Sequence, residues 1–134
     1  MKALSVKQPV GSLIKLGLKP IETRTWKTNY RGDILICGSL NWFRGYLRLP
    51  RRFTDEENVE SYNLKGKAIC IATLVDIKSM VKEDEKQACC AIYPGAYSWI
   101  LENIRPIKPF PVKGKLSLFE VDDSLIQYYN INFK

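Results

Sequence analysis

Residues 17–26 read GLKPIETRTW and lead the chain from a helix into a strand. Before them, the apolar side chains of residues 9–16 recur at helical spacing, and Gly17 is placed to end that helix as a left-handed cap. Pro20 then holds the preceding residue in an extended conformation. Residues 21–26 alternate as the side chains of a strand do. The stretch therefore predicts a short helix, a turn and a strand.

Three charged side chains of this stretch are expected to share one surface. The strand period places Glu22 and Arg24 on one face together with Trp26, and the helix stop is expected to direct Lys19 outward to the same side. An arginine paired with a glutamate forms a rigid fork for a phosphate or a base edge, while a lysine supplies a point charge. The alternative interpretation is an ordinary surface ion pair worth less than about 1 kcal/mol.

Short strand patterns dominate the rest of the chain. They cover residues 4–8, 33–37, 67–77, 97–107 and 116–121. Gly38-Ser39 is expected to end the second of these strands, residues 40–65 to form an irregular excursion in which Thr54 begins a short helix, and residues 82–90 to be mostly helical. The third strand is apolar on both faces and therefore central. This pattern indicates an α+β fold, a small mixed barrel in one domain over residues 1–134.

The composition excludes several kinds of chemistry. No histidine occurs among the 134 residues, which removes Ser-His-Asp and Cys-His nucleophiles, imidazole bases and histidine-containing zinc sites. The four cysteines have no Cys-x-x-Cys spacing and are expected to be small buried hydrophobes in a reducing compartment. No apolar run is long enough to cross a bilayer, and the N-terminus has no signal-peptide core. We therefore expect a cytoplasmic protein without a membrane span, metal or cofactor.

Basic charge is concentrated toward the N-terminus. The formal net charge is +7, and residues 1–52 hold eleven lysines and arginines against two acidic residues. A region this basic attracts a polyanion such as a nucleic acid; the alternative is a basic surface that only confers solubility. Four arginines of the excursion lie near aromatic residues: Arg44, Arg48, Arg51 and Arg52. This pattern is typical of a lip that binds a single strand of nucleic acid, and the alternative is a loop folded back over the barrel.

Five stretches of the chain resemble the ASCH domain family of the PUA-like superfamily. They are residues 3–9 (ALSVKQP), 17–28 (GLKPIETRTWKT), 30–32 (YRG), 97–106 (YSWILENIRP) and 111–115 (PVKGK). The resemblance implies a PUA-like β-barrel with helices packed at its openings, and a cleft whose charged residues correspond to Lys19, Glu22 and Arg24. Members of the family are generally thought to bind RNA, some are reported as ribonucleases, and one branch hydrolyses N4-acylated cytidines.

The first expected function is an RNA-binding module. It would recognise RNA or a nucleotide through Lys19, Glu22 and Arg24, with the four arginines as an outer lip. Trp26 would stack on a base, and Ser39 would hydrogen-bond the ligand at a strand end. Trp26 is equally expected as a barrel plug, and a serine after glycine is usually turn chemistry.

The second expected function is a small hydrolase that acts on RNA or on an N4-acylated cytidine, with Lys19 as base and Glu22 as proton carrier or divalent-ion ligand. In the amidohydrolase branch of the family, a threonine nucleophile stands three residues after the lysine. Glu22 occupies that position here, and Thr23 is expected on the opposite face of the strand. A third interpretation is an adaptor domain whose basic face contacts an acidic protein.

Overall fold

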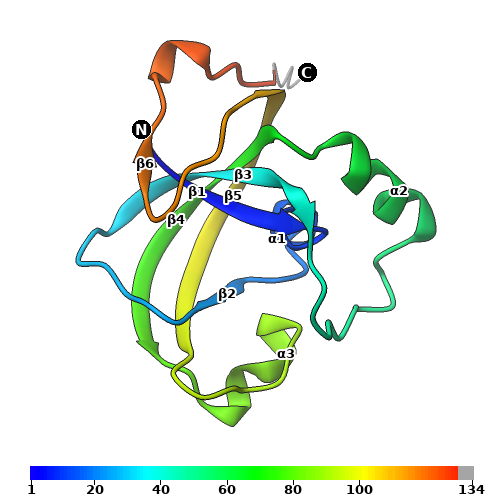
Figure 1. The fold of residues 1–134 in the computed structure, drawn as a ribbon, viewed down its shortest axis with the longest axis vertical. Helices are drawn as coiled ribbons and strands as arrows, with labels where there is room; N and C mark the ends of the chain where they lie inside the picture. Colours follow the sequence, from blue (N-terminus) through cyan, green and yellow to red (C-terminus); the bar gives the residue numbers. More distant parts are fainter. Residues whose placement is uncertain (130–134) are drawn as a thin grey trace, which may run out of the picture.

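The structure, a computed structural model, describes residues 1–129 (Figure 1), so residues 130–134 of the expected single domain lie outside the described part. Its strands are β1 (Lys2–Gln8), β2 (Ile21–Arg24), β3 (Gly32–Trp42), β4 (Lys67–Ser79), β5 (Tyr97–Pro111) and β6 (Phe119–Glu120). Its α-helices are α1 (Val10–Lys15), α2 (Asp55–Asn63) and α3 (Glu85–Ala88), and short 3-10 helices lie at Lys82–Asp84 and Asp123–Leu125. These elements confirm the expected α+β class.

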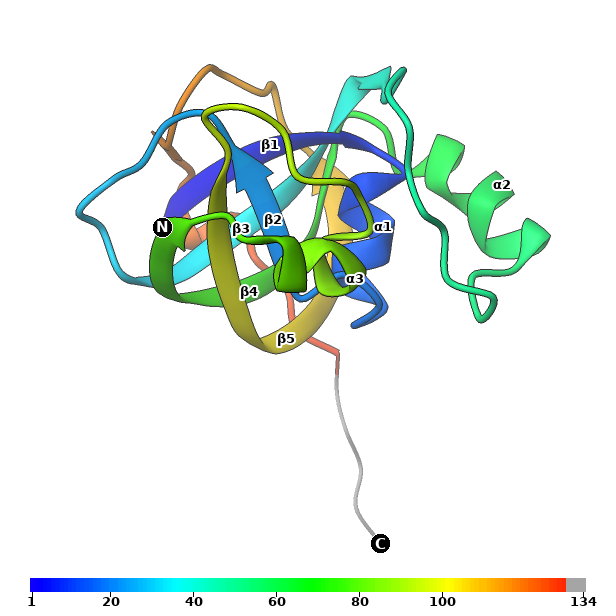
Figure 2. The same cartoon turned by 90° about the horizontal axis from the view of Figure 1, so that it is seen from below.

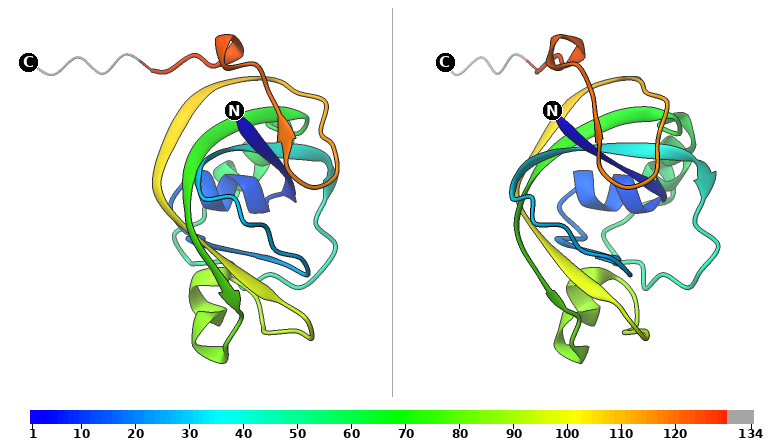
Figure 3. Two further views of the ribbon diagram at one scale, coloured as in Figure 1. Left: turned by 90° about the vertical axis from the view of Figure 1, so that its left-hand side faces the viewer. Right: turned by 60° about the vertical axis from the view of Figure 1, so that its left-hand side comes forward.

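The strands form one sheet in the order β2-β5-β4-β3-β1-β6. β1 and β3 run parallel, and every other neighbouring pair is antiparallel. The sheet curls around α1 (Figures 2 and 3), which brings Arg24 of β2 within hydrogen-bond distance of Ser5 in β1. Within residues 1–129 no strand pairing joins β1 to β2. The edges of β1 and β2 therefore face each other along a line where Arg24 and Ser5 meet without a strand ladder. We call this line the seam.

The helix α1 fills the interior of the curled sheet. Residues 10–14 are all buried, and Val10 and Ile14 pack in one apolar cluster with side chains of β1, β3, β4 and β5. Burial of each such side chain contributes about 1.5–3 kcal/mol. The helix ends as predicted, because Gly17 has a φ of +74° and its N–H donates to the Ile14 carbonyl.

A buried glutamine fixes the start of α1, and no sequence pattern predicts it. Gln8 Nε2 donates to Ser12 Oγ at 3.0 Å, and Gln8 Oε1 accepts from the Ser12 N–H at 2.9 Å. The side chain thus satisfies an N–H of the first helical turn, as an N-cap residue does. The Gln8 carbonyl also accepts from the Phe43 N–H at 2.7 Å. One residue therefore connects β1, α1 and the chain after β3.

Several predicted strand boundaries are wrong. The strand expected over 21–26 ends at Arg24, and the one expected over 97–107 runs on to Pro111. β3 does not stop at Gly38-Ser39 but runs on to Trp42, because an irregularity in its pairing with β1 lets Trp42 pair with Gln8. The last strand, expected over 116–121, is limited to Phe119–Glu120, because only the first residues of β1 pair with it.

The helix expected to start at Thr54 is confirmed as α2. Thr54 Oγ1 accepts from the Glu57 N–H at 3.1 Å, and Glu57 Oε1 accepts from the Thr54 N–H at 2.9 Å, which is a capping box. Ser61 is the one buried residue of this helix. α2 accordingly stands off to one side of the sheet (Figure 2).

The four cysteines are free and buried, as predicted. Burial raises the pKa of the Cys37 and Cys70 thiols to about 12. Because the thiolate is the reactive form, neither thiol is a nucleophile at neutral pH. No helix within residues 1–129 has the length and apolar character needed to span a membrane.

Candidate functional site

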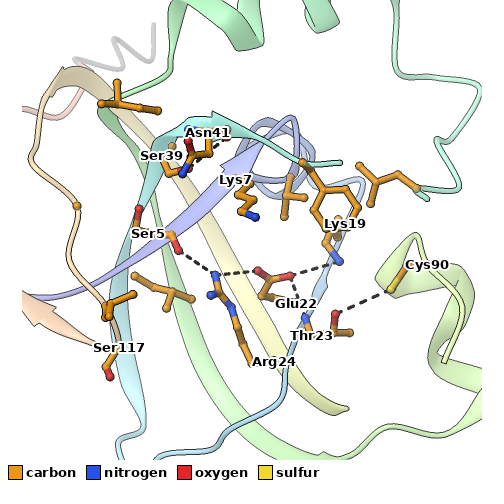
Figure 4. A pocket seen from close by; sticks show the side chains of 18 of the residues that line it. Ser5, Lys7, Lys19, Glu22, Thr23, Arg24, Ser39, Asn41, Cys90 and Ser117 are labelled. Atoms are coloured by element: carbon orange, nitrogen blue, oxygen red, sulfur yellow. Dashed lines mark hydrogen bonds and ion pairs between the residues drawn. The ribbon is translucent and has the colours of Figure 1, made fainter. Parts of the chain in front are cut away.

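A cleft of about 1430 Å³ lies over the seam (Figure 4). Its walls come from β1, β2, the end of β3 and the loops that follow β3, α3 and β5. The arginines of the 44–52 loop do not line it. The other predicted binding residues do: Lys19, Glu22, Arg24, Trp26 and Ser39.

Glu22 lies at the centre of the charged group and is only 6% exposed. Its Oε1 accepts from the Thr23 N–H at 2.8 Å and lies 3.5 Å from Lys19 Nζ, while its Oε2 accepts from Arg24 Nη2 at 3.2 Å (Figure 4). Two cations and a backbone donor therefore compensate a carboxylate that burial would otherwise penalise. The expectation that Glu22 and Arg24 share a face is confirmed.

Lys19 points inward, so the prediction that the helix stop directs it outward is wrong. The residue is 1% exposed, and its ammonium donates to the carbonyls of Ile21, at 2.9 Å, and of Ala88. With Glu22 Oε1 as the third neighbour, each of its three N–H groups has an acceptor within reach. The side chain turns inward because the fold offers a full set of acceptors there, one of them at the end of α3.

Arg24 spans the seam. Its Nη2 donates to the Ser5 carbonyl at 2.9 Å and to Glu22 at 3.2 Å, which ties the edge of β2 to the edge of β1. Nη1 and the buried Nε have no hydrogen-bond partner among residues 1–129. A guanidinium carries five N–H donors and no acceptor. The side chain is 24% exposed, so it is anchored through one nitrogen and keeps donors for an acceptor on a ligand.

Trp26 packs against the core, as one of its two predicted roles requires, and its stacking on a base stays a prediction. It meets the buried Trp99 edge to face, with ring centroids 4.9 Å apart and ring planes at 79°, and its carbonyl accepts from Trp99 Nε1 at 3.2 Å. Trp26 therefore packs against the core and also lines the cleft. Ser39 Oγ accepts from the Asn41 N–H at 3.1 Å, which is local turn chemistry at the border of the cleft.

The arginine-rich loop (residues 44–52) lines the cleft with Tyr46 and Leu47 but with none of its arginines, and Arg48 fastens it to α3. The Arg48 N–H donates to the Cys89 carbonyl at 2.7 Å, and its Nη1 donates to Glu85 Oε1 at 3.3 Å. The Ile92 N–H and Arg48 together hold the pKa of Glu85 below its usual range. Arg48 therefore positions the loop, and the other three arginines of the loop are exposed.

Thr23 turns its hydroxyl toward α3, where Oγ1 lies 3.9 Å from Cys90 Sγ. Strand alternation turns the hydroxyl away from Arg24, yet Thr23 still borders the cleft because β2 is an edge strand. No hydrogen bond to a carboxylate or an amine activates this hydroxyl among residues 1–129. The described residues also contain no group of three carboxylate or thiol side chains that could hold a metal ion.

A model of the ASCH domain family matches residues 4–111 of the sequence. The chain belongs to the ASCH domain family. This ASCH domain is similar to the ASCH protein from Zymomonas mobilis, with a TM-score of 0.62 and 14% identity over 95% of this chain and 96% of that chain. For a tyrosine-to-phenylalanine variant of that protein, the TM-score is 0.59 and the identity 14%, over 94% of this chain and 98% of that chain. For a serine-to-alanine variant, the TM-score is 0.58 and the identity 13%, over 94% of this chain and 96% of that chain. Identity this low shows the shared fold alone, and no curated protein sequence matches the chain.

The fold expected of an ASCH domain is therefore confirmed, with its curled sheet and few helices. The domain also places in the cleft three lysines that the sequence reasoning missed: Lys7, Lys113 and Lys115. A Cβ on Gly114 would lie 2.7 Å from Ser5 Oγ, so the glycine lets the loop after β5 rest against β1, beside the carbonyl that anchors Arg24. The stretch PVKGK, which resembles the family, is the sequence signal that points to this loop.

The cleft of the ASCH domain is basic. Five of its lining residues are lysines or arginines, and Glu22 is the one carboxylate among its described lining residues. Because Glu22 is already paired with two cations, the excess positive charge is left to Arg24 and to the exposed lysines at positions 7, 113 and 115. The arrangement can hold an anion or another group rich in hydrogen-bond acceptors.

Proposed function

We propose that this ASCH domain is an RNA-binding module that holds RNA or a nucleotide in the cleft over the seam. The observation that carries the proposal is which nitrogens of Arg24 have hydrogen-bond partners. Its Nη2 is held by Ser5 and Glu22, whereas Nη1 has no partner among the described residues. A guanidinium fixed in this way presents Nη1 as a preorganised, charged donor to a phosphate or a base edge. Lys19 supports this arrangement, because it holds Glu22.

Charge and aromatic surface both suit a nucleic acid. The basic excess of the cleft concentrates phosphate groups, and the affinity should fall steeply with salt because phosphate contacts release counterions. Trp26 and Tyr46 line the cleft and offer ring faces to bases. Beyond the cleft, the exposed arginines of the loop would contact further phosphates: Arg44, Arg51 and Arg52.

Hydrolysis is a weaker candidate because the groups expected to perform it are already engaged. A general base needs a lone pair at its nitrogen, whereas Lys19 Nζ faces three acceptors that hold its protons. Both oxygens of Glu22 likewise have partners. We therefore assign these two residues to the positioning of Arg24.

The proposed setting is the cytoplasm. The four cysteines are free, which is typical of proteins that work in a reducing compartment.

Fluorescence anisotropy with a labelled RNA tests the proposal. Arg24→Ala removes the fixed charged donor and should weaken binding roughly 10- to 100-fold, from about 1.5–3 kcal/mol of charge-assisted hydrogen bonding. Lys108→Ala is the matched control, because it removes one exposed positive charge outside the cleft. If the two variants bind alike, the cleft is not the site. If oligoglutamate displaces RNA at physiological salt as well as RNA itself does, the domain is instead an adaptor for acidic proteins.

A further inference from the structure

Three strongly exposed apolar side chains border the same cleft. Leu40 is 76% exposed, Tyr46 94% and Leu116 95%. All three line this cleft, where apolar side chains so exposed offer contact surface to a ligand that a basic cleft alone does not. We call Leu40, Tyr46 and Leu116 the apolar rim.

The apolar rim comes from three separate parts of the chain. Leu40 is in β3, where it packs over Gly66 so closely that a Cβ there would lie 2.9 Å from Leu40 Cδ2. Tyr46 lies in the loop before α2, and Leu116 lies in the loop after β5. The exposed lysines of the cleft belong to the same neighbourhood: Lys113 and Lys115 precede Leu116, and Lys7 is on β1, which pairs with β3. Apolar and cationic side chains thus occur together at the opening.

The cleft is larger than one nucleotide needs. Pockets that enclose a single small ligand usually measure about 300–1,000 Å³, and this cleft measures about 1430 Å³. A nucleotide anchored at Arg24 therefore leaves part of the cleft unfilled.

We infer that the cleft binds an oligonucleotide segment of at least two unpaired nucleotides, with one nucleotide at Arg24 and flanking bases on the apolar rim. Each base can place its flat apolar face against Tyr46 or a leucine, and each phosphate between two bases can pair with a lysine of the opening. A duplex hides its base faces, and a free nucleotide fills only part of the cleft. This inference rests on the proposed function and adds the length of the ligand and the residues that detect it.

Affinity as a function of ligand length tests the inference. Uridine 5′-monophosphate and oligouridylates of two, four and six nucleotides compete against a labelled hexamer. We expect the affinity to rise about tenfold or more from the monophosphate to the tetramer, because additional bases gain contacts with the rim.

Variants of the rim separate this inference from the proposed function. Tyr46→Ala and Leu116→Ala should each weaken hexamer binding about fivefold or more, and should weaken monophosphate binding by a smaller factor. Arg24→Ala should weaken both ligands. Val59→Ala is the matched control, because Val59 is a 62% exposed apolar side chain on α2 outside the cleft. Thermal unfolding checks that each variant keeps its fold.

Two outcomes overturn the inference and leave the proposed function standing. One is equal affinity for monophosphate and hexamer, with both lost in Arg24→Ala. The other is a length dependence that Tyr46→Ala and Leu116→Ala do not reduce. Failure of the unaltered domain to bind any of these ligands, or any labelled RNA, overturns the proposed function and the inference together.

Discussion

Glu22 is the residue that holds the charged group of the cleft together. In Glu22→Ala, the buried Lys19 ammonium loses its counter-ion and Arg24 loses one of its two anchors. Removal of one partner of a buried ion pair costs about 3–5 kcal/mol. We therefore expect the free energy of unfolding to fall by about 3 kcal/mol, measured by urea denaturation.

The matched control is the double variant with Lys19→Met and Glu22→Leu, which removes both charges and keeps side-chain volume. It should recover part of the lost stability, since apolar replacements of a buried ion pair are often neutral, whereas the Ile21 and Ala88 carbonyls lose the lysine donor. A double variant no more stable than Glu22→Ala would contradict the view that the unpaired ammonium causes the loss.

Asp33 makes the stability of the domain depend on pH in the acid range. Hydrogen bonds from Arg105 and from Thr73, which donates at 2.7 Å, hold the pKa of Asp33 below the usual 3.8. The folded state thus favours the charged form, so this stabilisation is complete above the usual pKa and is lost as the pH falls through the lower value. Asp33→Asn should be less stable at pH 7 and should lose less stability from about pH 5 to 2. Thermal unfolding across that range checks this, and parallel pH profiles of the two proteins would contradict it.

Among the elements, the loop after β5 depends on one glycine for its place. Because a Cβ on Gly114 would lie 2.7 Å from Ser5 Oγ, Gly114→Ala should shift the loop and its two lysines. We expect RNA affinity, measured by anisotropy, to fall about three- to tenfold, as for the loss of a phosphate contact or two.

Gly17→Ala is the contrasting control. Gly17 has a φ of +74° and nothing within 4 Å of a built Cβ, so alanine is strained there without a clash. This variant should lose about 1 kcal/mol of stability and keep its RNA affinity. If Gly114→Ala binds RNA as tightly as the unaltered domain, the loop does not contribute to the site.

Local signals predict the end of α1 and the start of β2, and distant contacts decide the rest. Gly17 and Pro20 act on the backbone beside them, and the alternation that pairs Glu22 with Arg24 spans two residues. The inward turn of Lys19 depends on the Ala88 carbonyl, 69 residues further along the chain. No local pattern contains that contact, just as none shows that the loop after β5 will rest against β1.

For the whole molecule, the cleft lies where the curled sheet does not close. β6 pairs with only the first residues of β1, which leaves the Ser5 carbonyl to accept from Arg24. A barrel closed by a full strand ladder has no open edge. Here Arg24 takes the place of that ladder, so the residue that joins the two ends of the sheet is also the one proposed to hold the ligand.

A crystal structure of the domain with a bound oligouridylate tests most directly whether Arg24 holds the ligand in the cleft. We expect a phosphate or base oxygen within about 3.2 Å of Arg24 Nη1, with Nη2 still on the Ser5 carbonyl. An oligonucleotide seated on the arginine-rich loop, with no atom of it inside the cleft, would contradict the central claim.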